Sequence, residues 1–213
     1  MNIQTQLITF ENWILRIRPP LGQGQRLLLM LHGWQGDENS MWVFAHKFPP
    51  DIWIVAPRAP HLAPQGGYSW SMPGAGWPSV DLLRPAAATL LDLLDTWPRA
   101  NGLDGSRVDV IGFSQGAAMA FTLAMLYPAR IRKLGILSGF APDYTEDVLT
   151  PNRLKGMDAF VAHGINDERI PIAQAQRSIQ LLEMAGAQVT YSETNMAHKL
   201  GVESLRLLET YLS

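Results

Sequence analysis

A serine enclosed by two glycines is the part of this sequence whose residue types point most directly to chemistry. The stretch VDVIGFSQGAAMAF, residues 108–121, passes from β-branched apolar residues through Gly112 and Ser114 to Gly116 and an alanine-rich segment. Glycines at such a junction indicate a tight or crowded backbone that a Cβ would obstruct. Two interpretations fit: Ser114 caps the helix after a strand-to-helix turn, or it is presented as a nucleophile on a sharp elbow.

Two residues able to activate a serine follow other predicted strands. Asp167 comes after the run DAFVAHG at 158–164, and His198 comes after QVTYSET at 188–194. A serine hydroxyl is a poor nucleophile at neutral pH, so His198 would accept its proton during attack on a carbonyl. Asp167 would hold the imidazole in the required tautomer and stabilise its cationic form. The chain order Ser, Asp, His is that of the α/β-hydrolase triad, and it favours the nucleophile interpretation.

Other residues compete for these roles. Glu168 stands beside Asp167 and is the alternative acid. His32 and His163 precede glycines at strand ends and are predicted to be structural. Ser138 also follows a strand, but no helix is predicted after it, so we expect it to pack or hydrogen-bond beneath the site.

Acyl transfer also needs hydrogen-bond donors for the oxyanion. The segment LMLHGWQGDE has a strand followed by a glycine-rich loop, and it offers the backbone N–H of Trp34. We expect this group to act with the backbone N–H of Gln115, at the start of the helix after the elbow. The same segment also fits an ordinary loop in which Asp37 or Asn39 caps a helix, and both interpretations can hold at once.

These residues require a sheet that gathers several loops at one edge. Short apolar runs, several of them nearly uninterrupted, predict buried parallel strands at 26–33, 51–57, 107–113, 133–139, 158–164 and 188–194. Alternating patterns at 3–10 and 13–19 predict an N-terminal antiparallel hairpin at a sheet edge. Helices are predicted at 38–48, 80–98, 115–127, 171–185 and 199–212. The alternation predicts a mostly parallel, doubly wound sheet. Together with the order Ser, Asp, His it favours an α/β-hydrolase fold without an inserted lid domain. The carboxyl edge of the sheet would carry the site.

The long loop from Pro57 to Pro78 is rich in glycine, proline and tryptophan. Long ordered loops are often functional, so this one is expected to contribute an apolar acyl pocket. The candidate substrate-binding residues are Tyr68, Trp70, Met72, Trp77 and Phe140, with ordinary loop packing as the alternative for each. The motifs carry no cluster of charged residues, which argues against strongly anionic substrates.

Composition limits the classes of function. With 213 residues, 47% of them hydrophobic, the chain is predicted to form a single domain over 1–213. The net charge of −2, without a run of Lys or Arg, argues against a nucleic-acid partner. The absence of cysteine excludes disulfides, thiolate metal sites and a cysteine nucleophile. No leader or membrane-spanning pattern is visible, so we expect a cytoplasmic protein without stable membrane insertion. The sequence leaves the oligomeric state open.

Seven motifs in this order resemble the carboxylesterase/phospholipase family of small α/β-hydrolases: LHGWQGDEN, APRAP, GGYSW, GFSQGAAMA, LSG, HGINDERIP and MAH, spread over 31–198. The resemblance implies Ser114 as nucleophile, Asp167 as acid, His198 as base, and the amides of Trp34 and Gln115 as the oxyanion hole. It also implies an acyl-enzyme mechanism without a metal or other cofactor. Two departures stand out, Gln35 where the family often has glycine and NMAHKL in place of the commoner Gly-His.

The sequence therefore predicts a serine carboxylesterase acting on carboxylic esters or thioesters of small to medium acyl chains. A lysophospholipase or an acyl-protein thioesterase is the alternative within the same chemistry. A peptidase or amidase would need a peptide-binding surface, for which no insertion is apparent. A non-catalytic binding protein on a hydrolase scaffold is disfavoured because Ser114, Asp167 and His198 are all present.

Overall fold

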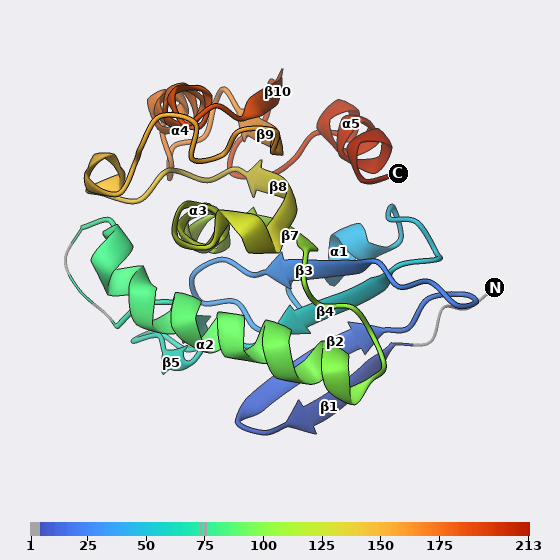
Figure 1. The fold of residues 1–213 in the computed structure, drawn as a ribbon. Coiled ribbons are helices and arrows are strands. Elements are labelled where there is room, and N and C mark those ends of the chain that lie inside the picture. The colour runs from blue at the N-terminus through green and yellow to red at the C-terminus, as the bar shows by residue number, and fades with distance from the viewer. Residues whose placement is uncertain (1–4, 73, 75) are drawn as a thin grey trace.

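An eight-stranded sheet forms the centre of the computed structural model, which describes residues 5–72, 74 and 76–213 (Figure 1). The strands follow the spatial order β1-β2-β4-β3-β7-β8-β9-β10. They are β1 (Gln6–Phe10), β2 (Trp13–Arg18), β3 (Leu27–Leu31), β4 (Trp53–Pro57), β7 (Val108–Phe113), β8 (Ile131–Leu137), β9 (Asp158–Gly164) and β10 (Gln188–Thr194). β2 pairs antiparallel with β1 and β4, and the other neighbours are parallel. The predicted sheet and its edge hairpin are confirmed, although residues 3 and 4 of the predicted first strand lie outside the described residues.

Helices cover both faces of this sheet. One face carries α2 (Val80–Ala100), α3 (Gln115–Leu126) and α4 (Ile172–Met184), and the other carries α1 (Trp42–Ala45) and α5 (Val202–Leu212) (Figure 1). Two short 3-10 helices, η1 (Pro128–Arg130) and η2 (Thr145–Asp147), complete the set of helices in the described residues. Four of the five predicted α-helices begin and end within three residues of the predicted positions. None of the helices in the part of the chain that the structure describes is long and apolar enough to cross a membrane.

The central strand β3 shows why the apolar runs predict strands covered on both faces. Leu27, Leu29 and Leu31 belong to the core beneath α2, α3 and α4, whereas Leu28 and Met30 belong to the core beneath α1 and α5. Successive strand side chains point to opposite faces, so one uninterrupted apolar run supplies both cores.

The prediction of a helix over 38–48 is wrong in its extent, since α1 covers only Trp42–Ala45. Glu38 is 2% exposed and forms a salt bridge of 2.7 Å with Arg58, which follows β4. This ion pair with a residue twenty positions away in sequence holds Glu38 in the loop before α1, so Glu38 is not part of the helix.

The alternative interpretation of this loop, in which Asp37 or Asn39 caps a helix, is also wrong. Asp37 Oδ1 accepts hydrogen bonds from the backbone N–H of Asn39 at 2.9 Å and from the hydroxyl of Ser40 at 3.0 Å. These contacts close a turn ahead of α1, whose N-cap is Met41 and makes no side-chain capping bond. Asp37 therefore shapes the loop after β3 rather than beginning a helix.

The loop over 57–78 contains a small antiparallel pair, β5 (His61–Leu62) and β6 (Tyr68–Ser69). The backbone N–H of Gln35 donates to the carbonyl of Tyr68, and the N–H of Tyr68 donates to the carbonyl of Gly36, both at 2.9 Å. These bonds fasten the loop to the segment after β3. Two predicted functional loops therefore lie against each other.

Candidate active site

Ser114 occupies the turn between β7 and α3 with φ 57° and ψ −119°, a backbone conformation that is rare for a non-glycine residue. A Cβ on Gly112 would lie 2.0 Å from the carbonyl oxygen of Gly116, and a Cβ on Gly116 would lie 2.1 Å from that of Leu31. Both glycines are therefore required for α3 to pack this close to β7 and β3. Ser114 is the N-cap residue of α3 by position, but its side chain makes no capping hydrogen bond, so its hydroxyl does not serve as a cap.

The Ser114 hydroxyl lies instead against an imidazole. His198 Nε2 is 3.1 Å from Ser114 Oγ, and His198 Nδ1 is 2.7 Å from Asp167 Oδ2. An ionised carboxylate only accepts hydrogen bonds, so Nδ1 carries the proton and Nε2 is left to accept from the serine hydroxyl. The Phe113 ring packs against the imidazole, with the two ring centroids 4.9 Å apart.

Asp167 is held by the backbone that follows it. Its Oδ1 accepts from the N–H of Arg169 at 3.0 Å and from that of Ile170 at 2.9 Å, which leaves Oδ2 for His198. Asp167 is 5% exposed, whereas Glu168 is exposed. The residue on the imidazole is therefore Asp167 and not the neighbouring Glu168.

Two further histidines are buried and have partners of their own. His163 Nε2 is 2.8 Å from the carbonyl oxygen of Ile170 and 3.5 Å from Asp167 Oδ2. His32 Nε2 accepts from the backbone N–H of Ala59 at 3.0 Å. Burial lowers the pKa of both imidazoles. These contacts agree with the structural role predicted for His32 and His163.

The two predicted oxyanion donors belong to backbone segments next to Ser114. A Cβ on Gly33 would lie 3.2 Å from Ser114 Cβ, so the backbone just before Trp34 passes directly beside the serine. Within residues 5–72, 74 and 76–213, the backbone N–H groups of Trp34 and Gln115 donate to no protein acceptor. Two unsatisfied donors beside a serine are what a developing oxyanion requires.

The side chain of Gln115 has a second role, which the sequence analysis missed. Its Oε1 accepts from the backbone N–H of Trp70 at 3.1 Å, and its Nε2 donates to the hydroxyls of Ser69 at 3.0 Å and Ser71 at 3.3 Å. Gln115 therefore fastens the loop over 57–78 to the start of α3. No local pattern signals this contact, because the two segments are more than forty residues apart in sequence.

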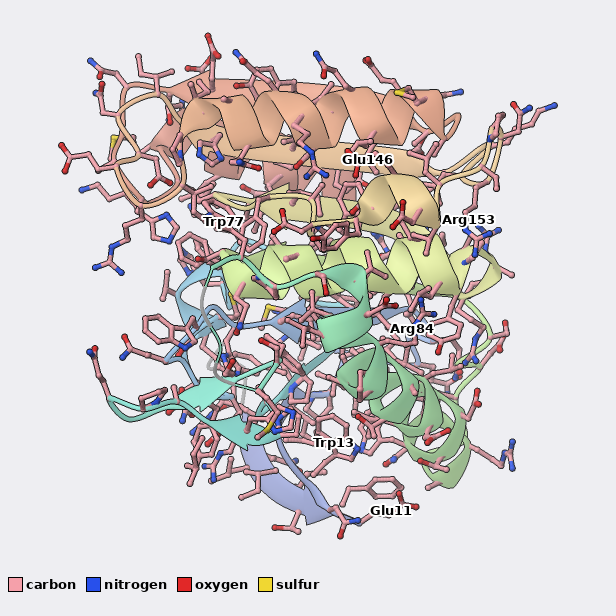
Figure 2. The ribbon with its side chains drawn as sticks, turned by 90° about the vertical axis from the view of Figure 1, so that its left-hand side faces the viewer. Glu11, Trp13, Trp77, Arg84, Glu146 and Arg153 are labelled. Carbon is pink, nitrogen blue, oxygen red and sulfur yellow. The ribbon has the colours of Figure 1, made fainter. Side chains whose placement is uncertain are left out.

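A cavity of about 830 Å³ opens beside Ser114 and His198. Met72, Trp77 and Phe140 line it, and the Trp77 and Phe140 rings meet edge to face with centroids 4.2 Å apart. Figure 2 shows Trp77 on the side of the molecule that carries α2, α3 and α4. Three of the five predicted pocket residues therefore lie at the cavity.

The structure does not bring Tyr68 and Trp70 to this cavity. Trp70 is fully buried, and its Nε1 donates to the carbonyl oxygen of His32 at 2.8 Å. The Tyr68 ring lies under the guanidinium of Arg58, 4.6 Å from it. Both side chains belong to the support of the site and not to its apolar wall.

Two residues that border the cavity, Arg169 and Ile170, were missed as lining residues although they lie beside Asp167 in sequence. Gln35 also lines it, with φ 65°, a left-handed conformation that explains why glycine suits this position. The Gln35 side chain donates to Gln65 Oε1 at 3.1 Å, so the departure from glycine adds a polar contact at the cavity.

The family model described as Phospholipase/Carboxylesterase matches residues 12–213. The chain belongs to this family. The resemblance drawn from the seven motifs is thereby confirmed, and membership makes the protein an ester hydrolase. Its elbow, imidazole and carboxylate are the parts that such chemistry needs.

Relatives of the chain carry related descriptions. Acyl-protein thioesterase 1 of Kluyveromyces lactis is 25% identical over 221 residues, which cover 93% of this chain and 96% of that protein. A probable carboxylesterase, SOBER1-like, of Arabidopsis thaliana is 28% identical over 121 residues, which cover 53% of this chain and only 44% of that protein. The solved structure of the Bacillus cereus carboxylesterase has a TM-score of 0.85 at 22% identity and covers 95% of this chain and 94% of that one. This last similarity supports the shared fold.

Proposed function

We propose that the protein is a serine hydrolase that cleaves carboxylic esters, or thioesters, through an acyl-enzyme on Ser114. The observation that supports this most directly is the unbroken hydrogen-bonded path from Ser114 Oγ through His198 to Asp167, with separations of 3.1 and 2.7 Å. Such a path lets the imidazole accept the serine proton while the carboxylate stabilises the resulting cation.

The reaction follows from these positions. Ser114 Oγ attacks the substrate carbonyl carbon as its proton moves to His198 Nε2, and the carbonyl oxygen becomes an oxyanion that the N–H groups of Trp34 and Gln115 stabilise. The tetrahedral intermediate then collapses, and His198 returns the proton to the departing alcohol or thiol. Water attacks the acyl-enzyme by the same route, with His198 again acting as base, and releases the carboxylic acid and free Ser114.

The cavity supports acyl chains of small to medium length. Met72, Trp77 and Phe140 supply apolar surface, and about 830 Å³ lies within the usual range for sites of small organic ligands. A thioester is the second candidate substrate, because the Kluyveromyces lactis relative is described as an acyl-protein thioesterase. A lysophospholipid remains an alternative of the same chemistry.

The test is hydrolysis of matched p-nitrophenyl esters and thioesters by Ser114→Ala. Loss of a triad nucleophile reduces turnover by about 10⁴-fold to 10⁶-fold. Ser138→Ala is a matched control, because Ser138 also follows a strand with positive φ, at 43°, but its Oγ is buried. Labelling of Ser114 by a fluorophosphonate would support the proposal, whereas near-normal activity of Ser114→Ala or labelling of another serine would refute it.

The continuous sheet supports treating residues 1–213 as one hydrolase domain. A cytoplasmic location stays a prediction from the sequence, and cell fractionation would test it.

A further inference from the structure

The permanent charge on the described residues that line the cavity beside Ser114 is positive only. Arg169 is its one permanently charged residue among the described lining residues, and no carboxylate is among them. The other ionisable group is His198, which the reaction uses. Asp167 is buried behind the imidazole, and the neighbouring Glu168 is exposed but does not line the cavity.

Among the described residues Arg169 has no acidic partner, unlike Arg58 and Arg177. Arg58 pairs with Glu38 at 2.7 Å, and Arg177 pairs with Glu146 at 2.8 Å. Among the described residues, the exposed side chain of Arg169 forms neither a salt bridge nor a hydrogen bond. Its five N–H donors are therefore available to an anion in the cavity.

A second, smaller hollow of about 450 Å³ also has only positive charge among its described lining residues. Lys199 is its one charged residue among the described lining residues. The residues that it shares with the larger cavity are Gly33, Trp34, Gln35 and Phe113. The two hollows beside the elbow thus offer a guanidinium and an ammonium to a substrate, and their described lining residues include no carboxylate.

We propose that Arg169 is a specificity residue that binds an anionic group of the substrate. The substrate class is an ester or thioester with a short apolar segment that ends in a carboxylate. The apolar segment would lie against Trp77 and Phe140, and the carboxylate would pair with the Arg169 guanidinium. This inference rests on the proposed function, and it revises the expectation from the motifs that anionic substrates are disfavoured.

The reason for that revision is spatial. In the sequence, Arg169 is one charge in the run NDERIP, with acidic neighbours on its N-terminal side. In the fold, Asp167 is turned to His198 and Glu168 does not line the cavity, so Arg169 is the one permanent charge among the described residues that line it. The acidic neighbours offset the positive charge of Arg169 in the sequence, but in the fold a ligand in the cavity meets only the positive charge of these three residues.

The test compares two p-nitrophenyl esters of equal chain length, the hexanoate and the monoester of adipic acid, corrected for spontaneous hydrolysis. The quantity measured is the ratio of kcat/KM for the adipate to kcat/KM for the hexanoate. Arg169→Gln should lower this ratio by about threefold to fivefold, as expected for loss of one charge-assisted contact made by an exposed side chain. Arg169→Lys should retain part of the ratio, and added NaCl should narrow it.

Arg206→Gln is the matched control, because Arg206 is exposed on α5, lines neither hollow, and its substitution changes the net charge equally. It should leave the ratio within about twofold, since an exposed charge that lines neither hollow is screened by water and salt. A ratio unchanged in Arg169→Gln, or lowered equally in Arg206→Gln, would overturn the inference while hexanoate turnover still supports the proposed function. If the wild-type protein hydrolyses neither ester, both proposals fail.

Discussion

Trp70 and Trp77 stand seven residues apart in one loop, yet the structure gives them opposite roles. Trp70 is fully buried in the core beneath α2, α3 and α4, and its indole N–H donates to the carbonyl of His32. Trp70→Ala should cost about 3 to 5 kcal/mol through the lost packing. The carbonyl left without its donor adds about 1 kcal/mol or more. For a chain of this size, the melting temperature should fall by about 8 to 24 °C.

Trp77 is half-buried, lines the cavity and packs edge to face on Phe140. Trp77→Ala should therefore change substrate preference more than stability. Each methylene held against an apolar wall contributes about 0.8 kcal/mol or somewhat less, so loss of one or two contacts should flatten the chain-length preference by about tenfold. Its melting temperature should fall less than that of Trp70→Ala.

The assay measures kcat/KM over a chain-length series of p-nitrophenyl esters together with the melting temperature of each variant. Trp70→Phe keeps most of the packing but lacks the indole N–H, so it provides a folded variant if Trp70→Ala does not accumulate. It should lower the melting temperature without moving the chain-length profile. A shifted profile in Trp70→Phe, or an unshifted profile in Trp77→Ala, would show that the cavity assignment is wrong.

Three other predictions concern the machinery around the elbow. Asp167→Asn should keep the fold but lower kcat by about 10⁴-fold, because the neutral amide no longer selects the tautomer of His198; near-normal kcat would contradict this. Gly116→Ala should lower the melting temperature sharply or prevent folding, since its Cβ would meet a β3 carbonyl oxygen at 2.1 Å, and an unchanged melting temperature would refute the close approach. Burial lowers the pKa of His32 and His163 below the usual 6.5, so the unfolded chain binds more protons as the pH falls below about 6.5. The free energy of unfolding should therefore fall towards about pH 5, and urea titrations that show it constant or rising would contradict the neutral, buried state.

Much of the site was predictable because its residues are marked by local backbone requirements. The glycines around Ser114 are needed by the turn itself, since a Cβ at Gly112 or Gly116 would collide with backbone atoms. Asp167 and His198 follow strands whose apolar runs are visible in the sequence, and parallel strands bring their carboxyl ends to one edge. The two residues could therefore be expected beside the serine before any contact was known.

The sequence by itself determined the parallel sheet with its N-terminal hairpin and the order of Ser114, Asp167 and His198, because strand periodicity and elbow glycines act over a few neighbouring residues. Only the tertiary structure decided that Trp70 supports the site while Trp77 borders the cavity, and that Arg169 faces it without an acidic partner. It also decided that the helix predicted over 38–48 is reduced to one turn. Each of these outcomes depends on contacts between segments far apart in the chain, such as Gln115 with the loop before α2, and a local pattern carries no information about such contacts.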